Sequence, residues 1–254
     1  MIKIVLGLVR DLYFNLCIIT IMTIRKTIDA ENIEMLDSII ETCDNLIEID
    51  RLIQRREDQP LKFNIELVQD NITNMKVDAI VNAAHEGLSG GGGVDGAIHR
   101  VAGAQLAGEC INQLYGCPVG YARITNGYNL TANYVIHTVA PVWRGGKFNE
   151  FNELRQCYSS CLNLASMQGL KSIAFPCLGT GAFCMPKKES AVEALDVVRS
   201  YFENVIESYG KSLDNHPIWM QCETSLESVK FVCFNPEDYQ CYLDLLPNGV
   251  LEIR

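Results

Sequence analysis

The sequence predicts an α/β sandwich with a mostly parallel sheet, preceded by a helical extension. Two observations support this prediction. After Pro60, short apolar segments with the pattern of strands alternate with longer segments that have the spacing of amphipathic helices. This alternation is typical of parallel sheets flanked by helices. Two of the strands lead directly into glycine-rich loops, and the carboxyl ends of strands are where such sheets bind ligands.

The composition of the 254 residues agrees with a folded chain and argues against some classes of binding partner. Hydrophobic residues make up 48% and charged residues 20%, which allows a sizeable core and excludes general disorder. The formal net charge of −10 argues against general nucleic-acid binding, which needs clustered cations. The 11 cysteines include no C-x-x-C pair, so the sequence has neither a zinc knuckle nor a thioredoxin-like motif. Unpaired thiols favour a reducing compartment, here the cytoplasm.

Residues 1–59 are expected to form an extension, and residues 60–254 the α/β domain. The uncharged run 12–24 is shorter than the roughly 20 residues of a membrane span. It is either an apolar packing segment, a stretch upstream of a start at Met22, or a signal-peptide core that directs the chain elsewhere. Residues 29–56 have the apolar stripe of one amphipathic helix. The polar break at 55–60 marks the domain boundary.

Six segments rich in Val, Ile and Phe are expected to be strands. They are 61–68, 77–82, 122–126, 134–139, 172–177 and 229–234. Three longer segments place apolar residues on one helical face, at 95–114, 150–167 and 188–208, and a short helix follows Pro236. The polar segment 209–228 is expected to be a connection, either a surface excursion or a lid.

The first glycine-rich loop follows the strand at 77–82 and opens the helix at 95–114. It contains four consecutive glycines, Gly90 to Gly93, which cost entropy unless the backbone must approach something closely. Amides at a helix N-terminus bind phosphate, so this loop is a candidate phosphate site. The glycines also match G-x-G-x-x-G, but they lie too far from the strand end for the dinucleotide-binding fold of an oxidoreductase. Dinucleotide binding therefore remains only an alternative interpretation.

The second loop follows the strand at 172–177 and contains Gly179, Thr180, Gly181, Ala182 and Phe183. Two such loops at strand ends indicate one crevice, which could hold a diphosphate from two sides. Phe183 would then cover a ribose face, or it is an aromatic residue of the core.

Four long motifs resemble those of one family. They read V-D-A-I-V-N-A-A, then G-G-G-G-V-D-G-A-I-H-R-V-A-G, then N-G-Y-N-L-T-A-N-Y-V-I-H-T-V-A-P, and then I-A-F-P-C-L-G-T-G-A-F, within about residues 61–246. The chain is similar in these motifs to macrodomains of the MacroD type. The resemblance implies a three-layer α/β/α sandwich with a mixed six-stranded sheet and a crevice for ADP-ribose, with no metal or redox cofactor. It also implies removal of mono-ADP-ribose from acidic side chains, and deacetylation of O-acetyl-ADP-ribose in many members.

The resemblance also implies roles for single residues. The diphosphate and the distal ribose would be wrapped by Gly91, Gly92, Gly93, Val94, Gly179, Thr180, Gly181, Ala182 and Phe183. Asp95 would position or activate the attacking water, although its spacing alone favours a helix N-cap. His99 follows one helical turn later and would face Asp95, either to orient it or as a structural residue. Asn82 would tie the loop backbone, and His137 and Cys177 are interpreted as buried structural residues.

Two positions depart from the family pattern. Where the family has N-A-A-N, with the second Asn at the distal ribose, this chain has His85. Where the family has G-D-I-T, with Asp accepting from the adenine amino group, this chain has Asp70, Asn71, Ile72 and Thr73. Either Asn71 or Asp70 would take that role beside Ile72.

Three functions remain open. Asp95 and the intact glycine loops favour a mono-ADP-ribosyl hydrolase, whereas His85 favours a reader that binds ADP-ribosylated proteins without cleaving them. An oxidoreductase is disfavoured by the long first loop. The expected partners are ADP-ribose and mono-ADP-ribosylated proteins.

Overall fold

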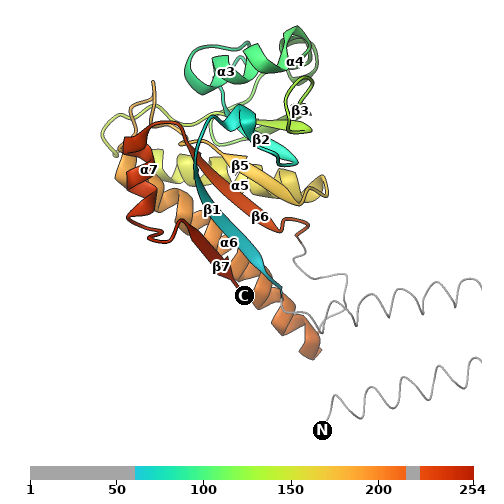
Figure 1. Cartoon of the computed structure of the whole chain (residues 1–254), viewed down its shortest axis with the longest axis vertical. Coiled ribbons are helices and arrows are strands. Elements are labelled where there is room, and N and C mark those ends of the chain that lie inside the picture. Colours follow the sequence, from blue (N-terminus) through green and yellow to red (C-terminus); the bar gives the residue numbers. More distant parts are fainter. Residues whose placement is uncertain (1–60, 216–223) are drawn as a thin grey trace, which may run out of the picture. The chain divides into compact units, whose positions relative to one another are not determined.

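Seven strands form one mixed sheet in the computed structural model, which describes residues 61–215 and 224–254. The strands are β1 (Phe63–Gln69), β2 (Ala79–Ala83), β3 (Ala122–Asn126), β4 (Tyr134–Thr138), β5 (Ser172–Phe175), β6 (Ser228–Cys233) and β7 (Val250–Ile253). Their order across the sheet is β3-β4-β2-β5-β6-β1-β7 (Figure 1). The five inner strands pair in parallel, and the edge strands β3 and β7 are antiparallel to their neighbours.

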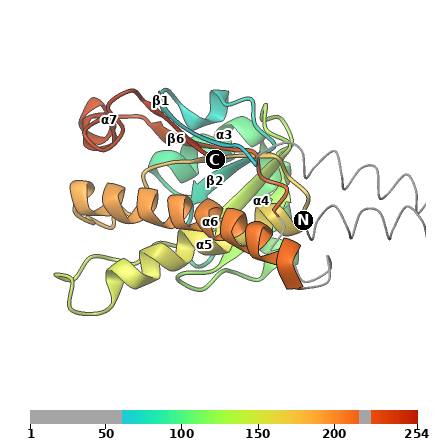
Figure 2. The same cartoon turned by 90° about the horizontal axis from the view of Figure 1, so that it is seen from below.

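Helices cover both faces of this sheet, so the predicted α/β/α sandwich is confirmed. They are α3 (Gly93–Ala102), α4 (Ala104–Glu109), α5 (Glu150–Met167), α6 (Lys187–Asn215) and α7 (Pro236–Leu243), with a π-helical turn at Cys110–Leu114 and a 3₁₀ turn at Ile72–Asn74. Figure 2 shows α5 and α6 side by side on one face of the sheet. One core cluster lies under α5, α6 and α7, and a second lies under α3 and α4.

Three sequence predictions about the elements need correction. The sheet has seven strands rather than six, because the four-residue β7 pairs with β1 at the edge and is too short to show an alternating pattern. The expected helix 95–114 is divided at Gly103, whose φ of +90° is incompatible with a helix. The expected connection at 209–228 begins later, because α6 continues to Asn215.

The predicted extension at 1–59 and the possible membrane, signal and amphipathic segments within it lie outside the described residues. Within the described ranges, we find no helix with the length and apolar character needed to span a membrane.

Candidate functional site

The sheet topology brings the two glycine-rich loops to the same edge. Strands β2 and β5 are neighbours and run parallel, with Ala79 opposite Ile173 and Ile80 opposite Ala174. Because parallel strands have their carboxyl ends at one edge of the sheet, the loop after β2 and the loop after β5 leave it together. The first loop continues into α3, which begins at Gly93.

Two glycines permit a close approach inside the first loop. A Cβ atom on Gly96 would lie 2.4 Å from the carbonyl oxygen of Gly91, far inside van der Waals contact, so only glycine fits there. A Cβ atom on Gly91 would lie 3.1 Å from Oδ2 of Asp95. The Asp95 carboxylate therefore lies directly against the glycine backbone.

Asp95 is buried and is not the N-cap of its helix. Its side chain is 7% exposed. The N-cap residue is Gly92, which has no side chain with which to cap the helix. Oδ1 of Asp95 instead accepts a hydrogen bond of 2.7 Å from Nδ2 in the side chain of Asn82, at the end of β2. The alternative of a simple helix cap therefore does not describe this side chain.

His99 faces Asp95, as its position one turn further along α3 predicts. Nε2 of His99 lies 3.3 Å from Oδ1 of Asp95. The geometry does not make a hydrogen bond, and this nitrogen is buried without a hydrogen-bond partner among the described residues. The pair thus has an imidazole nitrogen available beside a buried carboxylate.

A series of hydrogen bonds links Asp95 to Asn82, His137 and Thr125. Because a carboxylate only accepts, the nitrogen of the Asn82 amide must face it, and the same nitrogen lies 3.1 Å from Nδ1 of His137. Nδ1 is therefore the acceptor, and we assign the ring proton to Nε2, which lies 2.9 Å from Oγ1 of Thr125. Burial, with a smaller contribution from His99, lowers the pKa of His137 to about 3. The expected structural role of His137 agrees with this burial.

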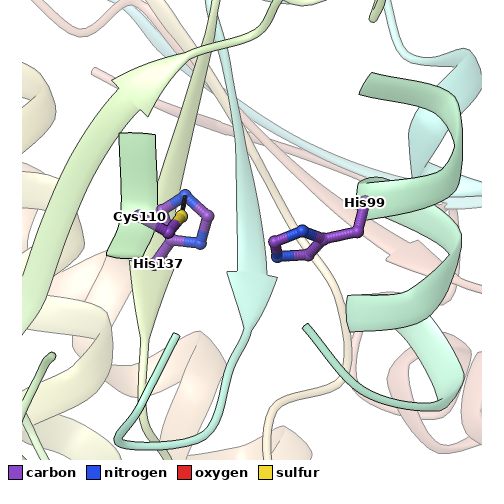
Figure 3. Close-up of side chains that lie close together, drawn as sticks. All are labelled: His99, Cys110 and His137. Atoms are coloured by element: carbon purple, nitrogen blue, oxygen red, sulfur yellow. Dashed lines mark hydrogen bonds between the residues drawn. The ribbon is translucent and has the colours of Figure 1, made fainter. Parts of the chain in front are cut away.

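The side chains of His99, Cys110 and His137 lie close enough together to raise the question of a metal site. One ligand atom from each lies within 4.8 Å of the other two, and Figure 3 shows His99 reaching from α3 toward the adjacent Cys110 and His137. Burial and the nearby charges of Glu109 and Asp95, however, raise the pKa of Cys110 to about 11. Nε2 of His137, which carries the ring proton, lies 2.9 Å from Oγ1 of Thr125 and 3.7 Å from Sγ of Cys110, so a metal ion bound here would have to displace the protons of both Cys110 and His137.

His85 is bonded to its own loop. Nδ1 accepts a hydrogen bond of 3.1 Å from the amide of Gly87, so Nε2 carries the proton and lies 3.1 Å from both the carbonyl oxygen of Gly90 and Oγ of Ser89. Both ring nitrogens are therefore used within the first loop. The family resemblance predicts that His85 lies at the distal ribose, whereas in the described structure its ring nitrogens bond within the first loop.

The polar turn after β1 distinguishes between the two candidates for the adenine amino group. Oδ1 of Asn71 caps the 3₁₀ turn by accepting from the amide and the hydroxyl of Thr73, so both of its lone pairs are used. Asp70 is exposed and, among the described residues, accepts hydrogen bonds only at Oδ1, from the Asn71 amide and the Asn74 side chain. The side chain of Ile72 is buried in the core, which leaves only its backbone to meet a ligand.

Phe234 belongs to the same edge and was not singled out as a site residue from the sequence. It follows β6 directly, and the residue is 73% exposed. The amide of Asp70 donates a hydrogen bond of 3.2 Å to the carbonyl oxygen of the preceding residue, Cys233. One signal in the sequence could have identified Phe234. It is an aromatic residue placed directly after a strand, and the end of that strand bonds to the polar turn.

The second loop is folded on itself and packs partly on the core. The amide of Met185 donates to the carbonyl of Gly179, and Oγ1 of Thr180 donates to the carbonyl of Cys177. Phe183 is half-buried against the large core cluster, so it is not an entirely buried core residue. The hydrogen bond from Cys177 to Cys233, followed by burial, holds the pKa of the Cys177 thiol well above its usual value, which agrees with an inert residue.

Comparison with known proteins identifies the relatives of this chain. Residues 81–194 match the family model described as Macro domain. A macro domain-containing protein of Listeria monocytogenes is 43% identical over 192 residues, which cover 74% of this chain and 100% of that protein. A protein of Enterobacter cloacae named O-acetyl-ADP-ribose deacetylase is 43% identical over 197 residues, covering 76% and 99%.

The solved structures that resemble this chain are also macrodomains. The Trypanosoma brucei macrodomain in complex with ADP-ribose has 40% identity and a TM-score of 0.60, over 72% of this chain and 68% of that chain. The Oceanobacillus iheyensis macrodomain with ADP has 34% identity and a TM-score of 0.59, over 72% and 90%.

Proposed function

We propose, since the chain belongs to the macro domain family, that it binds ADP-ribose and hydrolyses esters of ADP-ribose. The substrates are proteins carrying mono-ADP-ribose on acidic side chains, as in MacroD-type enzymes, and O-acetyl-ADP-ribose. The relatives named O-acetyl-ADP-ribose deacetylase and the macrodomain solved with ADP-ribose support this proposal.

The adenine end of the ligand would lie at the turn after β1. Oδ2 of Asp70 has no hydrogen-bond partner within the described part of the chain, and it can accept from an adenine amino group, which donates only. The exposed ring of Phe234, attached beside this turn, offers a face for stacking the base. Stacking on an aromatic ring contributes about 1–3 kcal/mol per base in other proteins.

The diphosphate would be bound mainly by backbone amides. Neither loop contains a lysine or an arginine between residues 83 and 96 or between residues 178 and 186. The exposed glycines Gly91 to Gly93 lead into the N-terminus of α3, where unpaired amides and the helix dipole favour an anion. A chain with a net charge of −10 can bind a diphosphate in this way without a cationic surface.

The arrangement of Asp95 is the observation that supports hydrolysis best. Its Oδ1 is fixed by Asn82, its Oδ2 lies against Gly91, and Nε2 of His99 is close by. In the proposed reaction Asp95 accepts a proton from water as the hydroxide attacks the ester carbon. The ester C–O bond then breaks, and the departing oxygen takes up a proton, which leaves a free acid and an ADP-ribose hydroxyl.

Calorimetry and an ester-hydrolysis assay test the proposal. The full chain should bind ADP-ribose more tightly than NAD, because NAD carries the bulky nicotinamide ring at the sugar carbon where ADP-ribose has only a hydroxyl group. It should also release acetate from O-acetyl-ADP-ribose. No heat with ADP-ribose, in a protein shown to be folded by circular dichroism, would overturn the proposal.

A reader function is the second candidate, because His85 is bound to its own loop. A side chain with both nitrogens used by Gly87 and Gly90 has no free group with which to orient the distal ribose. A reader would bind ADP-ribose as described but release no acetate at any enzyme concentration, which separates the two candidates in the same assay.

A further inference from the structure

The loop between β4 and α5 is fastened to the second glycine-rich loop. The amide of Trp143 donates a hydrogen bond of 2.9 Å to the carbonyl oxygen of Phe183. The indole also packs against Phe151 in the first turn of α5, with ring centroids 5.2 Å apart. The position of Phe183 therefore depends on the shape of residues 141–149, which we call the β4–α5 loop.

A single buried carboxylate organises the β4–α5 loop. Glu150 is 0% exposed and begins α5. Its Oε1 accepts from the amides of Arg144 (2.9 Å) and Gly146 (3.2 Å), and its Oε2 accepts from the amide of Phe148 (2.7 Å). No lysine or arginine within the described ranges forms an ion pair with it.

The backbone amides favour the charged form of Glu150. Burial by itself would raise its pKa, but hydrogen bonds from the backbone amides of Glu150 itself and of Phe148, Arg144 and Gly146 outweigh burial and hold the pKa below its usual value. Three N–H groups converge on two oxygens, so an amide side chain would turn an NH₂ group toward one of these donors. Only a carboxylate satisfies all three.

The β4–α5 loop needs such an anchor because most of it faces solvent. Residues 144–149 are exposed, and Gly145 and Gly146 have φ values of +98° and +77°. Glycines in this region leave the unfolded loop with many conformations. A Cβ atom on Gly146 would lie 2.8 Å from the Trp143 ring, so the loop closes tightly over the side chain whose amide holds Phe183.

We propose that Glu150 is a positioning residue for ligand binding, acting on the second glycine-rich loop through the β4–α5 loop and Trp143. The inference rests on the proposed function, because it takes the second loop to enclose the second phosphate and the distal ribose of ADP-ribose. Glu150 does not touch the ligand. Its contribution is to hold the carbonyl of Phe183, and hence the loop, in one position before the ligand arrives.

The test compares Glu150→Gln with Glu153→Gln in the full chain. Both remove one negative charge from the first turn of α5, but no side-chain hydrogen bond involves Glu153 among the described residues. We expect Glu150→Gln to weaken ADP-ribose binding by about tenfold, as for one or two lost hydrogen bonds. Binding of AMP, which lacks the second phosphate and the distal ribose, should change less than about twofold. Glu153→Gln should change neither.

Hydrogen exchange measured by mass spectrometry gives a readout that does not depend on the ligand. In Glu150→Gln, exchange should accelerate in peptides covering residues 142–149 and 179–185, and remain unchanged in β2 and β5. If Glu150→Gln does not fold, Glu150→Asp takes its place, because it keeps the charge but is too short to reach all three amides.

The outcomes separate the two proposals. If the unaltered chain does not bind ADP-ribose, the proposed function fails, and the exchange data still decide whether Glu150 controls the second loop. Unchanged ADP-ribose affinity in the variant, or equal losses for ADP-ribose and AMP, would overturn the positioning role alone. So would faster exchange in the β4–α5 loop without any change at 179–185.

Discussion

One oxygen of the Asp95 carboxylate is bound by a series of hydrogen-bonded side chains, and the other lies against the backbone of Gly91. Asn82 bonds to Asp95 and His137, and His137 bonds to Thr125. Each of these groups is buried, so a missing partner at any point would leave an unpaired polar group, which costs about 1–3 kcal/mol. His99 differs from His137, because its Nε2 is buried without a hydrogen-bond partner among the described residues. It is therefore the imidazole in this group that can act together with Asp95.

The neutral state of His137 leads to a prediction about pH. Burial and His99 lower the pKa of His137 from 6.5 to about 3, so below pH 6.5 the unfolded chain binds a proton there that the folded chain does not. The contribution to the free energy of unfolding is thus full above pH 6.5 and falls as the pH drops toward about 3. In NMR spectra the ring resonances of His137 should stay constant between about pH 8 and 5. An inflection near pH 6.5 would contradict the hydrogen-bonded arrangement.

His85 leads to a prediction about turnover. In His85→Asn the carboxamide offers a donor and an acceptor to the distal ribose, which the loop-bound imidazole does not. Hydrolysis of O-acetyl-ADP-ribose should become faster, by up to about 10²-fold. The dissociation constant of ADP-ribose should change by less than about tenfold, because the ribose contacts of the carboxamide offset the lost imidazole bonds to Gly87, Gly90 and Ser89. Ser89→Ala, which removes only the Ser89 contact of His85, is the control. Slower turnover in His85→Asn would mean that holding the loop is the main role of His85.

At the scale of elements, the sequence predicted the bounds of a long helix and of a short strand correctly. The helix expected at 150–167 matches α5, and the strand expected at 122–126 matches β3. The apolar spacing of residues 95–114 continues across a helix break, since the residues on both sides of Gly103 pack on the same core cluster. The role of Glu150 has no signal in the spacing, because its three partners are backbone amides that any sequence would supply.

The contact between the first loop and α3 is tested by a glycine substitution. Gly96→Ala would place a Cβ atom 2.4 Å from the Gly91 carbonyl, so the loop must move away from Asp95. We expect ADP-ribose affinity to fall by at least about tenfold, as for a lost hydrogen bond or more. Gly108→Ala in α4 is the matched control, because its Cβ atom meets nothing within 4 Å. It should stabilise the fold by about 0.5–1 kcal/mol in thermal unfolding. Equal affinities for both variants would contradict the close approach.

At the scale of the molecule, the fold and the meeting of the two loops could be predicted from the sequence, whereas the partners of single polar atoms could not. Strand–helix alternation indicates the sheet, and glycine loops at two strand ends indicate one edge. The bond between Asn82 and Asp95 joins segments that both belong to recognisable motifs. The bond between His137 and Thr125 depends on the antiparallel pairing of β3 and β4, which the predicted mostly parallel sheet did not specify.

Removal of residues 1–59 should leave ligand binding intact. All of the side chains assigned to the site lie between Asp70 and Phe234, and 192 residues of this chain cover the whole of the Listeria monocytogenes relative. The dissociation constant of ADP-ribose for residues 60–254 should agree with that of the full chain within about twofold, as measured by calorimetry. A shortened protein that fails to fold, or that binds at least tenfold more weakly, would place the extension in the domain.

We infer that Asp95 makes this macro domain a hydrolase rather than a reader. The most direct test is mass spectrometry of ADP-ribose released from a protein mono-ADP-ribosylated on Glu or Asp, incubated with the full chain, with Asp95→Asn, or with Asp196→Asn as an exposed control. We predict release by the full chain and by Asp196→Asn, and a rate about 10²–10⁴-fold lower for Asp95→Asn, which should still bind ADP-ribose. Binding without release by the unaltered chain, or equal release by all three proteins, would contradict the claim.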